Sequence, residues 1–434
     1  MGQKVFLSLS SPGEQVAVAA TPDDDYLPQA PRVHRFERGE EVAYYNAFTH
    51  NWLLRGPRDP APSAAEVDEL AEIDWKFTPL EMLSDPHLMR VEVTQACNFQ
   101  CTYCIVFENN VAQLHQHMSV ETATGLLEWY HENMPGGTVM LIGGEPTMNW
   151  AACQVFLEGV PLEAGKELYT NGILLSDDAI ARLRDLNVSI RLSIDGFERH
   201  HRQRVNHAGQ TLYDQVIDRF RAMQRLGADV GVNCTMTPAN LPDMVDIHHY
   251  FVQELGARHV NYSIPHMTVN SDVADGFDMD AYTAAMMEIY EDAKRNHVYV
   301  AQIMKRLAYI ARKQFKAIGC TVIGPEVTFY PDGKRTLCTK LDSHPKTSSV
   351  TPEDIYANLP FFMADCRQCP AIGICGGGCY WDAKTRFDRF QDMRECDFQR
   401  QLLERMLWDV VDWSRSGQDF PRLLNGVFHT RMFG

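Results

Sequence analysis

Residues 91–104 read VEVTQACNFQCTYC, and this stretch decides the fold. The alternating apolar residues Val91 and Val93 are typical of a strand. The loop after that strand carries three cysteines in C-x3-C-x2-C spacing: Cys97, Cys101 and Cys104. Three thiolates on a short loop can hold three irons of a cubane cluster and leave the fourth iron open. Catalytic metal sites keep an open position and structural sites close it, so the stretch predicts a catalytic centre.

Two other interpretations of these cysteines are available. Their spacing also places them on one face of a helix, where they would be small residues of a buried core. A zinc site would use the same thiolate ligands. Both alternatives weaken when the other motifs of the chain are considered, because those motifs also follow candidate strands.

The composition is that of an ordinary globular protein. The 434 residues suffice for about two or three domains, and 45% of them are apolar. The 40 basic and 57 acidic residues give a net charge of −17, so we expect no nucleic-acid partner. We also expect no membrane partner, because the sequence has neither a signal-peptide core nor a long apolar run. The twelve cysteines of a chain that we expect to be cytoplasmic bind metal more often than they form disulfides.

Candidate strands and helices alternate from about residue 88 to 270. This alternation predicts an α/β fold with a parallel sheet, a partial (β/α)6 TIM-like barrel. Active sites of such barrels lie on loops at the carboxyl ends of the strands, where the cysteine loop is expected. The candidate strands are 90–94, 138–142, 167–169, 188–194, 229–235 and 259–264, and the candidate helices are 119–133, 177–186, 211–226 and 241–255.

The rest of the chain divides by composition. The N-terminal segment has strand-like patches and a short helical pattern after Ser63, and we interpret it as a candidate peptide-docking element or a lid. The region from Cys320 to Cys396 is rich in cysteine, glycine and proline. The predicted segments are 1–80 (N-terminal), 88–275 (partial barrel), 276–316 (helical bridge), 317–400 (cysteine-rich domain) and 401–434 (C-terminal helix and tail).

Two short motifs follow candidate strands of the barrel. In GGEP, Gly143 and Gly144 would let the backbone approach a ligand closely, and Glu145 could accept from a ligand ammonium. In SIDG, Ser193 and Asp195 point the same way from a strand end, which suits ribose hydroxyls. A tight turn after each strand is the alternative for both motifs.

The cysteine spacing with Tyr103 inside it, followed by GGEP and SIDG, resembles the radical S-adenosylmethionine (SAM) superfamily over residues 88–270. The resemblance implies that the open iron chelates the amino and carboxylate groups of S-adenosylmethionine. An electron from the cluster would then break the sulfonium's bond to the 5′ carbon, and the 5′-deoxyadenosyl radical would take a hydrogen atom from the substrate. The implied cofactor contacts are Gly143, Gly144 and Glu145 at the amino group, Ser193 and Asp195 at the ribose, and also Tyr103 and Arg204. Arg204 could instead be an ordinary surface arginine.

The C-terminal cysteines resemble the SPASM extension, which holds two auxiliary iron–sulfur clusters. A zinc-ribbon scaffold is the alternative, since its C-x2-C element is similar. By this resemblance the distal cluster uses Cys366, Cys369, Cys375 and Cys396, and the near cluster uses Cys320, Cys338 and Cys379.

The near cluster has only three cysteines, which leaves two interpretations. Glu326 could be the fourth ligand, or one iron could stay open for a substrate group. The last two cysteines, Cys153 and Cys234, are interpreted as core residues of the barrel.

The resemblance implies a peptide maturase with three iron–sulfur clusters, whose substrate is a ribosomally made precursor peptide or protein. The expected product is a crosslink, either thioether or carbon–carbon. The alternatives are sulfatase-maturase-like formylglycine formation, radical dehydrogenation of a small alcohol and a metal scaffold without catalysis. An electron donor such as flavodoxin or ferredoxin is also implied. The sequence does not identify a catalytic side chain.

Overall fold

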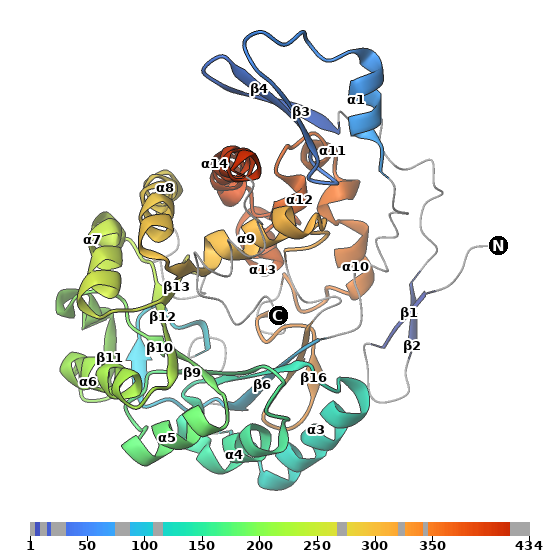
Figure 1. Cartoon of the computed structure of the whole chain (residues 1–434). Coiled ribbons are helices and arrows are strands. Elements are labelled where there is room, and N and C mark those ends of the chain that lie inside the picture. The colour runs from blue at the N-terminus through green and yellow to red at the C-terminus, as the bar shows by residue number, and fades with distance from the viewer. Residues whose placement is uncertain are drawn as a thin grey trace. The chain divides into compact units, whose positions relative to one another are not determined.

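The structure is a computed structural model that describes residues 5–8, 15–18, 32–73, 87–106, 116–266, 276–319, 326–341 and 346–416. Its contacts divide the chain into two compact units, whose elements are labelled in Figure 1. The barrel unit comprises Asp85–Gln302 and Gly324–Ser349. The cysteine-rich unit comprises Met1–Ser84, Ile303–Ile323 and Val350–Gly434. The two units do not coincide with the five predicted segments. The N-terminal segment and the C-terminal helices, which are far apart in sequence, belong to the same unit.

The barrel unit contains a nine-stranded sheet in the order β14-β13-β12-β10-β9-β8-β6-β15-β16. All neighbouring strands are parallel except β15 and β16. The α/β partial-barrel prediction is therefore confirmed, and β15 adds a parallel strand beside β6. The strands are β6 (Leu88–Thr94), β8 (Thr138–Gly143), β9 (Lys166–Thr170), β10 (Ser189–Ser193), β12 (Asp229–Thr235), β13 (His259–Ser263), β14 (Tyr299–Val300), β15 (Glu326–Phe329) and β16 (Arg335–Thr336).

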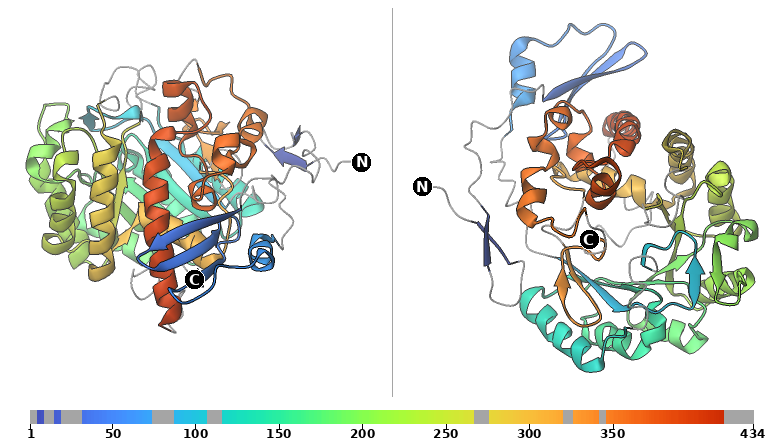
Figure 2. Two further views of the ribbon diagram at one scale, coloured as in Figure 1. Left: turned by 90° about the horizontal axis from the view of Figure 1, so that it is seen from above. Right: turned by 180° about the vertical axis from the view of Figure 1, so that it is seen from behind.

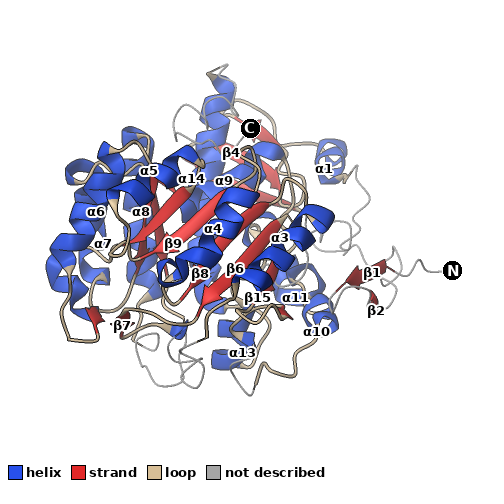
Figure 3. Cartoon of the chain, turned by 90° about the horizontal axis from the view of Figure 1, so that it is seen from below, coloured by secondary structure: helices blue, strands red, loops and turns tan. Residues whose placement is uncertain are grey.

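Helices cover one face of this sheet (Figure 3). Serine side chains cap two of them, since Ser119 accepts from the Thr122 N–H and Ser176 from the Ala179 N–H. The predicted helix at 241–255 is broken into a 3-10 turn, a short α-helix and a π-helical turn. The helices are α3 (Val120–Asn133), α4 (Trp150–Gly159), α5 (Asp177–Asp185), α6 (Tyr213–Arg225), α7 (Met244–His249) and α8 (Met279–Asn296).

The two faces of the sheet differ in polarity, as the register shows. On one face lie fully buried apolar residues such as Val91, Leu141 and Ile190. The opposite face, which we call the inner face, carries polar side chains on neighbouring strands. Paired positions there are Arg90 with Thr328, Arg191 with Tyr169, and Asn233 with Asn261.

The cysteine-rich unit combines strands from the N-terminus with helices from the C-terminal part of the chain. Helix α1 begins as the sequence predicts, because Ser63 and Glu66 form a capping box. Among the described residues, no helix has the length and apolar character needed to cross a membrane. The elements are β1 (Val5–Ser8), β2 (Gln15–Val18), β3 (Val33–Arg38), β4 (Glu41–Asn46), β5 (Trp52–Arg55), α1 (Ala64–Ala71), most of α9 (Ala301–Arg312), α10 (Pro352–Ala357), α11 (Ala364–Arg367), α12 (Ile372–Cys375), α13 (Tyr380–Phe387) and α14 (Cys396–Arg415).

The β3-β4-β5 sheet lies against α14 (Figure 2). Arg38 donates to Asp412 at 2.6 Å, and its guanidinium lies 4.4 Å from the centre of the Trp408 ring. Arg415 donates to Glu41, also at 2.6 Å. The N-terminal segment is thus part of the unit that holds the C-terminal cysteines. The predicted boundary between 400 and 401 falls inside α14, whose first residue is Cys396.

Candidate active site

The three cysteines of residues 91–104 lie after β6, on a loop that includes the short strand β7 (Phe99–Cys101). Strand β7 pairs antiparallel with β11 (Arg204–Asn206), which places Cys101 opposite Arg204. The Phe99 N–H donates to the Cys97 sulfur at 3.4 Å, and the Cys104 N–H donates to the Cys101 carbonyl at 3.1 Å. This geometry excludes the alternative in which the cysteines share one face of a helix.

The chemistry of these thiols fits a metal cluster. Burial raises the pKa of Cys97 and of Cys101 to about 12, so an isolated thiolate would be unstable there at neutral pH. A bound metal ion deprotonates its thiol ligands outright. Soft thiolates select iron–sulfur clusters or zinc. The loop is therefore suited to the cluster that the sequence predicts.

The GGEP motif packs directly on the cysteine loop. The Gly144 N–H donates to the Thr94 carbonyl at 2.9 Å, and the Glu145 N–H donates to the Ala96 carbonyl at 2.8 Å. A Cβ atom on Gly143 would overlap the Thr94 carbonyl oxygen, and one on Gly144 would overlap that of Ala96. We expected the glycines to admit a ligand; the close approach in the structure is to the backbone that carries the cysteines.

Glu145 is fully buried, and its carboxylate connects the ends of β8 and β9. One oxygen accepts from the Thr147 N–H (3.1 Å), the Thr147 hydroxyl (2.6 Å) and the Thr170 hydroxyl (2.6 Å). The other oxygen accepts from the Asn171 N–H at 2.7 Å. A carboxylate has about four acceptor positions, so the protein itself uses most of this group. A contact between Glu145 and a ligand ammonium stays a prediction.

Asp195, Tyr103 and Arg204 form a buried cluster that ties the cysteine loop to the end of β10. The Tyr103 hydroxyl donates to the Asp195 carboxylate and accepts from Arg204 at 2.8 Å. Arg204 also lies 3.6 Å from Asp195. Burial lowers the pKa of Arg204, but Tyr103, Cys101 and Asp195 together raise it well above its usual value. Arg204 is thus a buried ion-pair partner and not a surface residue.

Of the predicted ribose contacts, Asp195 therefore has protein partners, and it also accepts from the Thr235 N–H at 3.0 Å. Ser193 is half-buried at the end of β10, paired with Asn233 of β12. Ribose binding by these two residues stays a prediction.

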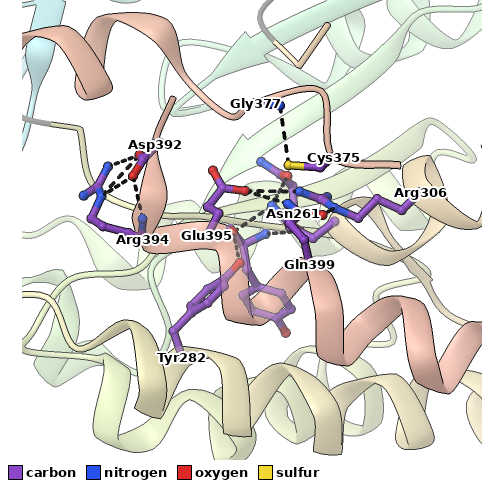
Figure 4. Close-up of polar contacts among 11 residues, drawn as sticks. Asn261, Tyr282, Arg306, Cys375, Gly377, Asp392, Arg394, Glu395 and Gln399 are labelled. Atoms are coloured by element: carbon purple, nitrogen blue, oxygen red, sulfur yellow. Dashed lines mark hydrogen bonds and ion pairs between the residues drawn. The ribbon is translucent and has the colours of Figure 1, made fainter. Parts of the chain in front are cut away.

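The structure brings three of the predicted distal ligands together. Cys366 lies in α11, Cys369 in the turn after it, and Cys396 at the start of α14. Burial, with the nearby Cys396 and Cys369, raises the pKa of Cys366 to about 11. Cys375 ends α12 and accepts from the Gly377 N–H at 3.4 Å (Figure 4). The backbone contact resembles the one at Cys97, and burial raises the pKa of Cys375 to about 12.

Side chains from α9 and α14 hold the surroundings of Cys375 (Figure 4). Arg306 donates to Gln399 at 2.5 Å and pairs with Glu395 at 3.3 Å. Gln399 donates to Glu395 at 2.8 Å. This network fixes the start of α14, and therefore Cys396, relative to α9.

The predicted near cluster is not assembled by the described residues. Cys320 lies outside them. Cys338 belongs to the barrel unit and Cys379 to the cysteine-rich unit. The ligand set of this cluster stays a prediction.

Glu326 has a partner that the sequence does not indicate. It lies on β15, and its carboxylate pairs with Arg90 of β6 through contacts of 2.9 and 3.2 Å. The Glu326 side chain is 5% exposed, and Thr328 also donates to it at 3.3 Å. The carboxylate is thus engaged in the sheet, which argues against its role as the fourth cluster ligand.

We predict that Glu326→Ala lowers the free energy of unfolding by about 2 kcal/mol, because Arg90 loses its buried partner while staying partly exposed. The iron content after reconstitution should not change. Chemical denaturation and iron analysis measure the two effects, and Glu158→Ala, in an exposed pair with Arg182, is the control. Unchanged stability with lost iron would instead identify Glu326 as a ligand.

The two remaining cysteines are core residues, as expected. Cys153 and Cys234 have no exposed surface. The Cys153 thiol donates to the Pro146 carbonyl at 3.3 Å, which supports the turn after GGE.

Sequence reasoning missed the polar inner face and one acidic residue on it. Glu92 lies between Val91 and Val93 on β6 and is 1% exposed. Burial raises the pKa of Glu92 to about 7, with Gln95 acting in the opposite direction. The available signal was a charged residue inside an apolar strand, at the position that faces away from the helices.

Glu92→Gln should change how stability depends on pH. Between pH 4.5 and about 7 the folded protein keeps a proton on Glu92 that the unfolded chain loses, so the wild type loses stability as pH rises. Glutamine cannot titrate, and we expect the variant to gain about 2.5 kcal/mol relative to wild type between pH 5 and pH 8. Urea denaturation at both pH values measures this gain. The exposed Glu128→Gln is the control, and parallel pH profiles of Glu92→Gln and wild type would contradict the prediction.

Comparisons with known proteins agree with this site. Residues 91–251 match the model of the radical SAM superfamily. The radical SAM cyclopropyl synthase TigE of Paramaledivibacter caminithermalis is 22% identical over 357 residues, which are 74% of this chain and 73% of that protein. The GTP 3′,8-cyclase of Tolumonas auensis is 30% identical over 148 residues, 32% of this chain and 42% of that protein.

Solved structures show the same fold. The anSMEcpe structure with bound AdoMet and Cp18Cys peptide has a TM-score of 0.57 and 16% identity, covering 79% of this chain and 99% of that one. Streptococcus suis SuiB bound to S-adenosylmethionine has a TM-score of 0.51 and 14% identity, and the match covers 72% of this chain and 77% of that one. The cysteine loop, the GGEP motif hydrogen-bonded to it and the matched model agree, and residues 91–251 form a radical SAM domain.

Proposed function

We propose that this enzyme is a peptide maturase that crosslinks a ribosomally made precursor peptide. The observation that carries the proposal is the combination of two separate cysteine sites, one on the radical SAM loop and one gathered around α11 and α14. The anSMEcpe structure of the same fold holds a peptide together with AdoMet, which supports a peptide substrate.

The cluster and S-adenosylmethionine, when bound, would supply a carbon radical that removes a hydrogen atom from the substrate. The protein's own contribution is rigidity and recognition. Gly144 and Glu145 hold the cysteine loop through backbone hydrogen bonds, and the Tyr103–Asp195–Arg204 cluster holds its other end. On the inner face, Asn261 donates to Asn233 at 2.6 Å and accepts from Gln302 at 2.8 Å. Such amides suit the N–H and C=O groups of a peptide.

A carbon–carbon crosslink is favoured over a thioether by the similarity to TigE, whose name describes a cyclopropyl synthase. In sulfatase-type maturases, aspartate follows the cysteine that corresponds to Cys338. This chain has Thr339 at that position, which disfavours formylglycine formation. The anSMEcpe similarity supports the fold and does not select that chemistry.

The proposal includes two auxiliary clusters, a cytoplasmic location and an electron donor such as flavodoxin or ferredoxin. We predict about ten to twelve irons per chain after anaerobic reconstitution, near four for each full cubane. Iron analysis with Mössbauer spectroscopy measures this number. Iron that stays at one cubane per chain would contradict the auxiliary clusters and leave the radical SAM assignment intact.

The test of the function uses a synthetic copy of a short peptide encoded beside the gene. Incubation with reconstituted enzyme, S-adenosylmethionine and dithionite should give a peptide that is lighter by two hydrogen atoms, and fragmentation should locate the new bond. Consumption of S-adenosylmethionine with unchanged peptide mass, for every neighbouring peptide, would exclude this function.

A further inference from the structure

Two arginines of the inner face form ion pairs. Arg90 pairs with Glu326 at 2.9 Å, and Arg191 pairs with Glu167 at 3.5 Å. Among the described residues, no basic side chain pairs with Glu92. The groups around Glu92 are Arg90 on its own strand, Met140 and Ile142 on β8, Glu326 and Thr328 on β15, and Gln95 of the loop.

The contact between Glu92 and Gln95 leaves one acceptor without a donor. Gln95 donates to one Glu92 oxygen at 3.3 Å, a long hydrogen bond. The Gln95 side chain is buried, and its oxygen has no hydrogen-bond partner among the residues that the structure describes. Buried polar atoms normally have partners, so the Gln95 oxygen indicates a missing donor. A group with several N–H donors and a positive charge would satisfy both residues.

The position of this pair matters for the cofactor site. Gln95 is next to Thr94 and Ala96, whose carbonyls hold the GGEP motif. The sequence assigned a ligand ammonium to Glu145, but four hydrogen bonds from the protein occupy that carboxylate. Glu92 is the nearby carboxyl group that retains acceptor capacity, and it lies on the inner face just before the cysteine loop.

We propose that Glu92 and Gln95 form a subsite for a protonated amine of a ligand bound on the inner face of the sheet. Two sources offer this chemistry: the α-ammonium of S-adenosylmethionine and an amine of the substrate. The subsite rests on the proposed function only for the second source. An ammonium would donate to the free Gln95 oxygen and compensate the Glu92 charge, which burial otherwise disfavours.

The test uses 19F NMR on reconstituted full-length enzyme at pH 8, where Glu92 is ionised. The probes are 4,4,4-trifluorobutylammonium and its uncharged counterpart 4,4,4-trifluorobutanol. Each is titrated with and without saturating S-adenosylmethionine, against wild type, Glu92→Gln and the exposed control Glu128→Gln. Circular dichroism and iron content verify that the isosteric variant is folded. The dissociation constant of S-adenosylmethionine is measured separately by anaerobic calorimetry.

We expect wild type and Glu128→Gln to bind the ammonium and not the alcohol, and Glu92→Gln to bind it at least about tenfold more weakly. If S-adenosylmethionine displaces the probe and itself binds about tenfold more weakly to Glu92→Gln, the amine is that of the cofactor. If the probe binds beside S-adenosylmethionine, the subsite serves a substrate amine. Equal binding of ammonium and alcohol, or of the ammonium to wild type and Glu92→Gln, would overturn the proposal. These outcomes do not depend on whether a peptide is modified.

Discussion

Replacing Cys97, Cys101 and Cys104 together by alanine should abolish formation of 5′-deoxyadenosine. Among the described residues of the loop that follows β6, 95–106, these three are the only cysteines. Without thiolates the loop has no means of binding iron, and S-adenosylmethionine has no metal to chelate it. Chromatographic quantification of 5′-deoxyadenosine under anaerobic conditions measures the effect. The iron bound by the cysteine-rich unit should remain.

The matched control is Cys153→Ala, which removes a fully buried thiol close to the GGEP turn. It tests whether loss of any barrel cysteine has the same effect. We expect this variant to retain both iron and cofactor cleavage, with a modest loss of stability from the small cavity. Cofactor cleavage by the triple variant at the wild-type rate would refute the assignment of the loop.

Gly144→Ala should have the second-largest effect. The new methyl group would overlap the carbonyl of Ala96, an atom that also accepts the Glu145 N–H. Backbone cannot give way as a flexible side chain can, so the cysteine loop must move. We expect the free energy of unfolding to fall by about 3 kcal/mol. Iron bound at the loop and 5′-deoxyadenosine formation should fall as well.

Gly125→Ala is the control for this variant, because Gly125 lies within α3 and a Cβ there meets no atom within 4 Å. Alanine at this position should stabilise the helix by up to about 1 kcal/mol. Urea denaturation of both variants and iron analysis separate the two outcomes. If Gly144→Ala resembles Gly125→Ala in stability and iron content, the close packing of GGEP on the cysteine loop does not determine the stability or the iron binding of the loop.

The sequence predicts the local features of the barrel well. Alternation around Val91 and Val93 predicts the strand, and Ser119 and Ser63 predict two helix starts, because each signal depends on residues within one turn. The position of the cysteines on a loop follows from the same local pattern. These are interactions between near neighbours in the chain, which the order of residues specifies directly.

Partners distant in the chain were not predictable. Glu326 follows Cys320 in sequence, which suggested a ligand, yet β15 joins the sheet beside β6 and gives it Arg90 as partner, 236 residues away. The protein partners of Asp195 and Glu145 were also not predictable, because motifs do not indicate which atoms the protein itself hydrogen-bonds. Glu92 belongs to no motif and became visible only when the strand register identified its neighbours.

The chain's two units differ in when their residues become available during synthesis. The barrel unit is formed mainly by one continuous stretch, Asp85–Gln302, so it can fold while translation continues. The cysteine-rich unit combines segments that are far apart in sequence, because Arg38 pairs with Asp412, which is synthesised 374 residues later. Its contact order is therefore high, and we expect it to fold later than the barrel unit. Chains that are still being synthesised should therefore have a folded barrel unit before the cysteine-rich unit is ordered.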